Sequence, residues 1–181
     1  MRRGMTVFLT VILMISLTAC SKDYGQEIEK HYQDIKGYTA TVRLTIHGAE
    51  YELLQSYQSP DIYRSEVLSP KNLKGTVSVI TADEIRLSGG EFSSVTMPRI
   101  AKASLSYLQL RDFFLAYFSQ GDRKLEETED GGILLTHTEN SDSIKQVMRV
   151  NKKTFAPEIM QGYDAEGNEV FKIEYLKFKK E

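Results

Sequence analysis

The sequence predicts an α+β fold, in which an antiparallel sheet packs against one N-terminal helix and one central helix. Three observations support this fold class. Apolar residues recur at helical spacing over 24–35, apolar and polar residues alternate over 38–47, and helical spacing returns over 100–120. Most of the remaining chain consists of short alternating segments separated by small polar turns, which is typical of antiparallel strands.

The first helix is expected to begin at Tyr24 and to stop at Gly37, because glycine commonly terminates helices. The strand that follows places Val42 and Leu44 on its apolar face, as expected for a half-buried strand. Further strands are expected at 51–57, 62–69, 76–80, 83–90, 91–95, 125–128, 133–138, 147–150, around 159 and at 171–178. The segment YDAEGNEV contains Gly167 and is expected to form a hairpin turn.

The central helix, expected over 100–120, carries a broad apolar stripe. The stripe consists of Ile100, Ala103, Tyr107, Leu110, Phe114, Tyr117 and Phe118. Packing against the sheet is the favoured interpretation, and a ligand-facing wall is the alternative. In the first case Val42, Leu44, Tyr107 and Phe114 form one buried cluster, and in the second the same four residues line a groove.

Two apolar residues of this helix lie outside the apolar stripe. Leu105 and Phe113 project near the polar side of the helical wheel. We therefore expect them to be exposed and to contribute to a partner surface, unless a loop covers them.

The N-terminus has the composition of a secretory signal peptide. Arg2 and Arg3 precede an apolar run of residues 5–19, and the single cysteine of the chain, Cys20, follows the triplet Leu-Thr-Ala. This ending resembles the lipobox of bacterial lipoproteins, which implies a signal peptide at 1–19, a lipidated tether at 20–23 and one domain at 24–181. The protein would then be extracytoplasmic and anchored to a membrane by acyl chains on Cys20. An ordinary signal peptide followed by an incidental cysteine is the alternative.

Charge and composition exclude several classes of function. The chain has a net charge of −2, and without its signal segment about −4, with basic and acidic residues interspersed. A nucleic-acid-binding protein would show a clustered basic surface instead. No G-x-S-x-G motif is present, and His31, His47 and His137 fall on different predicted elements. We therefore expect no catalytic residues, no metal and no cofactor, and we expect the protein not to be an enzyme.

The order of the elements and the wording of the C-terminal segment carry a family resemblance. Helix, strand meander, central helix and three strands follow one another, and the last part reads VNKKTFAPEIMQGYDAEGN over 150–168. This arrangement resembles the LolA/LolB superfamily of bacterial lipoprotein carriers and receptors. The resemblance implies a half-barrel, in which a curved antiparallel sheet wraps around the central helix and leaves an apolar groove for acyl chains.

Within that superfamily, a short lipidated chain is most similar to the germination lipoprotein family of spore-forming clostridia (GerS). That resemblance implies a non-enzymatic lipoprotein that binds and licenses a cell-wall amidase, which prepares the spore cortex for hydrolysis. The alternative function is a lipid or lipoprotein carrier or receptor, with acyl chains as ligands between sheet and helix.

Overall fold

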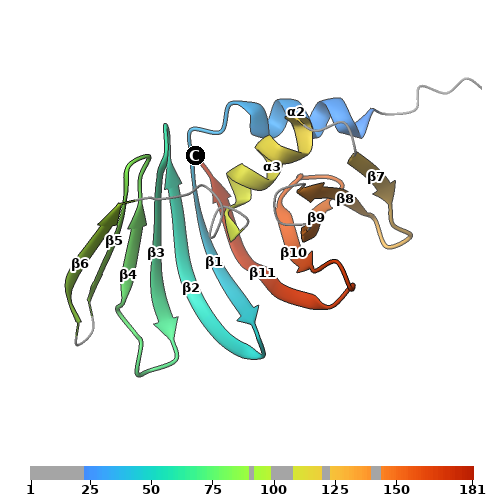
Figure 1. Ribbon diagram of the computed structural model, residues 1–181. Coiled ribbons are helices and arrows are strands. Elements are labelled where there is room, and N and C mark those ends of the chain that lie inside the picture. The colour runs from blue at the N-terminus through green and yellow to red at the C-terminus, as the bar shows by residue number, and fades with distance from the viewer. Residues whose placement is uncertain (1–22, 90–91, 99–107, 120–122, 140–143) are drawn as a thin grey trace, which may run out of the picture.

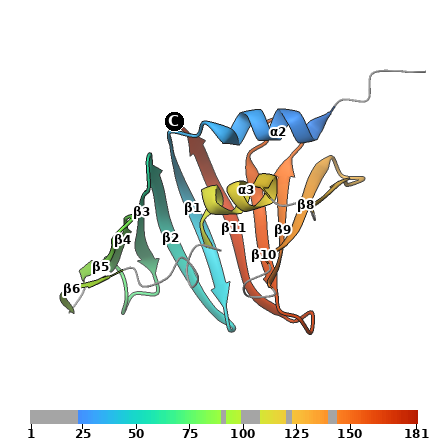
Figure 2. The ribbon, with the colours of Figure 1, turned by 45° about the horizontal axis from the view of Figure 1, so that its top comes forward.

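The computed structural model describes residues 23–89, 92–98, 108–119, 123–139 and 144–181 of the chain. Within these ranges eleven strands form one antiparallel sheet, and two helices lie on one face of it (Figures 1 and 2). The helices are α2 (Tyr24–Gln33) and α3 (Leu110–Ser119). The strands are β1 (Gly37–Ile46), β2 (Ala49–Gln58), β3 (Ile62–Ser69), β4 (Val77–Ile80), β5 (Glu84–Gly89), β6 (Phe92–Pro98), β7 (Arg123–Glu127), β8 (Gly132–Glu139), β9 (Ile144–Asn151), β10 (Pro157–Tyr163) and β11 (Glu169–Lys180).

The strand order explains how the chain is organised. It runs β6-β5-β4-β3-β2-β1-β11-β10-β9-β8-β7, so that the first and last strands of the chain pair in the middle of the sheet. The chain leaves the centre along one meander, ends it at the β6 edge, passes through α3 and returns from the β7 edge. The antiparallel meander confirms the fold class expected from the alternating segments, and Gly167, with φ of 87°, lies in the expected hairpin between β10 and β11.

Helix α2 forms where the sequence predicts it. The Asp23 side chain caps the helix by accepting a hydrogen bond from the backbone N–H of Gln26 at 3.2 Å. Ile28 and Tyr32 are buried, and the Tyr32 hydroxyl donates a hydrogen bond to the carbonyl oxygen of Phe155 at 2.6 Å. This bond ties the helix to the turn between β9 and β10.

Helix α3 is shorter than the sequence predicts within the described residues, because it begins at Leu110 and the two residues before it are not α-helical. Its buried residues are Leu110, Phe113, Phe114 and Tyr117, at the i, i+3, i+4 and i+7 positions of one face. The expected exposure of Phe113 is therefore wrong, since its side chain is 1% exposed. The buried face is centred on the line from Leu110 to Tyr117, so Phe113 and Phe114 flank that line on either side.

One glycine in the sheet makes room for a core aromatic ring. Gly162 on β10 pairs with Phe171 on β11. A Cβ atom at Gly162 would lie 2.0 Å from the Phe171 ring, well inside the distance that real contacts show. The Phe171 ring therefore occupies the space of the missing side chain and is 1% exposed.

Candidate interaction surface

The apolar face that carries the core continues beyond the helices onto three outer strands. Residues paired across an antiparallel sheet point to the same face. The register Tyr63↔Ile80, Ile80↔Ile85 and Ile85↔Met97 thus forms one row that runs from β3 to β6. A second pair, Leu87↔Val95, lies beside it on the same face. We call strands β4, β5 and β6 the wing, and these apolar residues lie on the face of the wing that is continuous with the core.

Exposure rises along this row. Tyr63 is 5% exposed and Ile80 8%, Ile85 is half-buried, and Met97 at the edge is 41% exposed. Leu87 and Val95 are 37% and 48% exposed. Three of the six exposed large hydrophobic residues in the described ranges are therefore on β5 and β6. Clustered exposed apolar side chains on one face are a feature of interaction sites.

The two edges of the sheet differ in charge. Four of the five residues of β7 are charged, and the Lys124 ammonium lies 2.9 Å from the Glu126 carboxylate. β6 has the sequence FSSVTMP and contains no charged residue. Charged side chains on an edge strand discourage pairing with another chain, so the charges of β7 oppose such pairing and β6 lacks them.

A close backbone contact joins the β3–β4 turn to the end of β5. Gly89 at the end of β5 has φ of +94°, and a Cβ atom there would lie 2.1 Å from the carbonyl oxygen of Gly75. Gly75 in turn donates a backbone hydrogen bond to the Val67 carbonyl at 2.8 Å. Glycine is therefore required at position 89 for the β3–β4 turn to contact the end of β5.

A polar network attaches the start of α3 to β3 and the turn before it, at the base of the wing. The Arg111 guanidinium lies 3.1 Å from the Asp61 carboxylate, and the Tyr63 hydroxyl donates to Asp112 Oδ1 at 2.8 Å. Burial and the nearby Asp112 carboxylate raise the pKa of Tyr63. A tyrosine with a raised pKa stays protonated at neutral pH, so its hydroxyl remains a hydrogen-bond donor that attaches α3 to β3.

His137 is the buried titratable residue under α3. Its side chain is 1% exposed, its ring centroid lies 5.1 Å from that of Phe113, and neither ring nitrogen has a hydrogen-bond partner among the described residues. Desolvation lowers the pKa of His137 to about 4. In the described ranges no three metal-ligating side chains gather, and His31 and His47 lie on α2 and on the β1–β2 turn.

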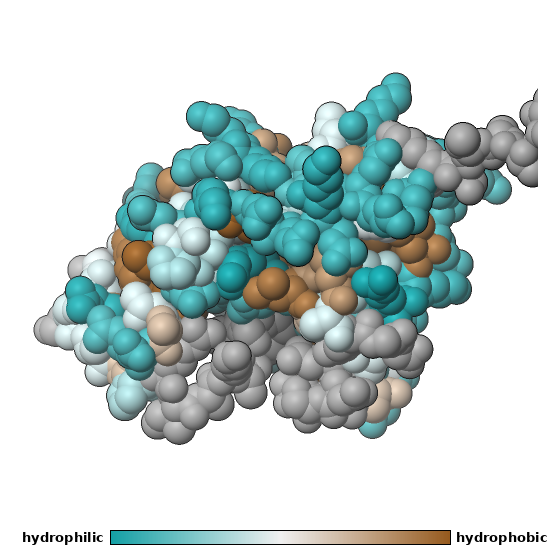
Figure 3. Space-filling model, turned by 90° about the horizontal axis from the view of Figure 1, so that it is seen from above, coloured by the Kyte–Doolittle hydropathy of each residue, from teal (hydrophilic) through white to brown (hydrophobic). Residues whose placement is uncertain are grey.

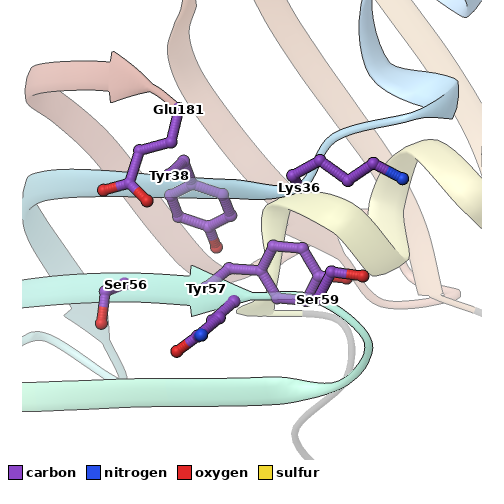
Figure 4. Close-up of a pocket in the computed structure, with 7 residues that line it drawn as sticks. Lys36, Tyr38, Ser56, Tyr57, Ser59 and Glu181 are labelled. Atoms are coloured by element: carbon purple, nitrogen blue, oxygen red, sulfur yellow. The ribbon is translucent and has the colours of Figure 1, made fainter.

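Two open clefts lie away from the wing. One, of about 560 Å³, is lined by Lys36, Tyr38, Ser56, Tyr57, Gln58, Ser59 and Glu181. Figure 4 shows its two tyrosines on adjacent strands, with Glu181 reaching in from the end of the chain. The other, of about 700 Å³, lies between α2, α3 and β7 and is lined by Asp23, Tyr24, Gly25, Gln26, Glu29, Tyr117, Phe118, Arg123, Leu125 and Glu127.

The residues expected at a groove are mostly in the filled core. Val42 is fully buried, Phe114 is 2% exposed, and Leu44 packs against the same cluster, while none of the three lines either cleft. Phe114 stacks on Tyr32 with ring centroids 3.6 Å apart, which fills the space between α3 and α2. Cys20, Leu105 and Tyr107 lie outside the described residues.

The surface seen from above is mostly hydrophilic, with separate small hydrophobic areas (Figure 3). In the described residues, no helix is long and apolar enough to cross a membrane.

No protein-family model matches the chain, and no curated protein matches it. Among solved structures, that of the CwlD amidase from Clostridioides difficile in complex with the GerS lipoprotein contains a chain 26% identical to this one. The match covers 90% of this chain and 96% of that chain, with a TM-score of 0.57.

Two further structures show the fold at lower identity. An uncharacterized conserved protein from Thermus thermophilus is 19% identical over 87% of each chain, with a TM-score of 0.58. A domain from Vibrio parahaemolyticus, assigned to outer membrane lipoprotein sorting, is 12% identical over 87% of this chain and 90% of that chain, with a TM-score of 0.50. The resemblance seen in the sequence is thus confirmed: this chain has a LolA-like fold and is similar to the GerS lipoprotein.

Proposed function

We propose that this protein is a non-enzymatic lipoprotein, anchored on the extracytoplasmic side of a membrane, that binds a cell-wall amidase through the wing and licenses it during spore germination. The single observation that supports this docking surface is the apolar row, whose side chains change from buried at Ile80 to exposed at Met97. The amidase is supported by the likeness to the C. difficile structure, whose lipoprotein is bound to CwlD. In this proposal the sheet acts as a half-barrel around α3 and gives the wing a rigid base.

The energetics favour a protein partner for this surface. Leaving Leu87, Val95 and Met97 in water forgoes about 25 cal/mol for each Å² of apolar area that a partner could bury. In protein interfaces a few such residues carry most of the binding free energy, about 2 kcal/mol or more each.

The test compares two exposed leucines on different parts of the fold. The full chain is purified in detergent and titrated with the CwlD-type amidase of the same organism. Leu87→Asp is expected to weaken binding about 30-fold, since 2 kcal/mol corresponds to that factor. Leu115→Asp is the matched control, because Leu115 is also exposed, at 47%, but lies on α3. Wild-type affinity of the Leu87→Asp variant would overturn the proposed surface.

The anchor is tested separately. In the proposal, residues 1–19 are removed, Cys20 is lipidated and residues 20–23 link it to the domain. Cys20→Ala is expected to abolish labelling with a palmitate analogue and association with membranes, because the thiol is the acceptor of the lipid. The melting temperature should not change, since Cys20 precedes the first described element, α2. Continued lipid labelling of the variant would refute the anchor.

A second candidate is an acyl-chain carrier or receptor. It is favoured by the cleft between α2, α3 and β7, whose lining includes Tyr24, Tyr117, Phe118 and Leu125. This candidate predicts saturable binding of a fluorescent fatty acid by the wild-type protein, whereas the amidase-binding function predicts none. The two functions are therefore separated by one titration.

A further inference from the structure

We infer that the partner is recognised by strand addition, so that an extended segment of the amidase pairs with β6 as a further strand of the sheet. This inference rests on the proposed function and specifies how the same surface binds. The segment that binds is a β-strand of the amidase with apolar side chains at alternate positions.

β6 lies at one edge of the sheet in the part of the chain that the structure describes. Among the strands that the structure describes, β6 pairs with β5 alone and stands at the end of the strand order. In an antiparallel edge strand, alternate residues direct their backbone N–H and C=O groups away from the sheet. These groups are the hydrogen-bonding partners that an added strand uses.

The β6 edge differs in its side-chain chemistry from the opposite edge, β7. β7 carries an ion pair within the strand, and its Glu127 is paired with Lys152 on the β9–β10 turn. β6 offers serine, threonine, valine and methionine side chains over Ser94–Met97, all exposed, with no charge to desolvate. An incoming strand would therefore bury no unpaired charge of β6.

The alternation of side chains along β6 determines which positions of the incoming strand must be apolar. Val95 and Met97 lie on the apolar face, next to Leu87 and Ile85, while Ser94 and Thr96 lie on the other face. An added strand places alternate side chains on each face. Those on the apolar face would contact Val95 and Met97, so this half of the pattern must be apolar. Pro98 has no N–H group, so pairing ends there and the added strand spans about six residues.

The decisive experiment is hydrogen exchange at single-residue resolution on the full chain in detergent, with and without the amidase. Strand addition predicts that every second backbone amide between Phe92 and Met97 gains at least about 10-fold protection on binding, while the β7 amides do not change. Amidase binding without protection of β6 would refute strand addition and leave the wing surface standing. Absence of amidase binding would refute both proposals. Protection that rises with the concentration of the chain alone would identify a second copy as the occupant and refute the amidase strand.

Two neighbouring proline substitutions test the same inference through the melting temperature and the affinity for the amidase. Of the Val95 and Thr96 N–H groups, one faces β5 and the other faces outward. Of Val95→Pro and Thr96→Pro, we therefore expect one to lower the melting temperature and the other to preserve it. The variant that preserves the melting temperature should bind the amidase at least about 10-fold more weakly than alanine at the same position, because alanine keeps the outward N–H group that proline lacks. Normal binding by that proline variant would overturn the inference.

Discussion

One face of one sheet carries two regions of similar side chains with different surroundings. Under α2 and α3, residues such as Val42, Ile133 and Phe171 are at most 1% exposed. On the wing, Leu87, Val95 and Met97 point to the same face but are 37–48% exposed. Helix cover makes the difference: α3 contacts α2 and β8, and the wing lies at the far end of the sheet from β7 (Figures 1 and 2). Stability therefore depends mainly on the covered region, which leaves the wing available for binding.

The largest expected effect is in the covered region. Phe114→Ala should lower the free energy of unfolding by about 3–5 kcal/mol, because it removes the ring that stacks on Tyr32 and leaves a cavity. Met97→Ala is the matched change on the wing and should cost less than about 1 kcal/mol, since the side chain is 41% exposed. Urea denaturation of both variants checks the contrast. Equal losses would mean that the wing belongs to the core.

The next effect is the pH dependence of the covered region. The pKa of His137 is about 4 in the folded protein, below the ordinary value of 6.5 for histidine. The unfolded chain therefore binds a proton at this position between pH 6.5 and 4, while the folded protein does not. Stability contributed by the neutral ring is complete above pH 6.5 and falls as the pH drops to 4, by about 3 kcal/mol in total.

The control for this pH effect is His137→Leu, which has no proton to bind at that position. The difference in unfolding free energy between this variant and the wild type should grow by about 3 kcal/mol in favour of leucine from pH 7 to pH 4. Parallel stability curves for the two proteins would show that His137 is protonated as easily when folded as when unfolded. Substitutions on the wing should leave the slope of both curves unchanged.

The sequence predicts the positions of the helices and strands better than it predicts which strands the helices cover. Alternation located most strands, and helical spacing located α2. The alternation of ILLTHT also puts His137 on the same face as Ile133 and Leu135, so its burial was readable from the sequence. The sequence pattern gives the wrong exposure for Phe113, because the apolar stripe includes residues 100–107, ahead of the first residue of the described helix, Leu110.

The exposure of the wing could not be predicted from a strand pattern. Val95 and Met97 alternate with polar residues in the same way as the covered Ile133 and Leu135. Whether such a face is buried depends on which strands the helices reach, and this is settled by tertiary packing. The lack of charge in 92–98 was visible in the sequence, but its meaning depends on β6 being an edge strand.

The central claim, that the wing and not the exposed surface of α3 binds the partner, is tested most directly by cysteine footprinting. The chain has a single native cysteine, Cys20, so Leu87→Cys and Leu115→Cys each introduce one defined probe, and the wild type gives the background. The rate of maleimide labelling is measured with and without saturating amidase. We predict that the amidase slows labelling at position 87 at least about 10-fold and leaves position 115 unchanged, because an interface core excludes water and reagent. Protection at position 115 with free labelling at position 87 would contradict the account.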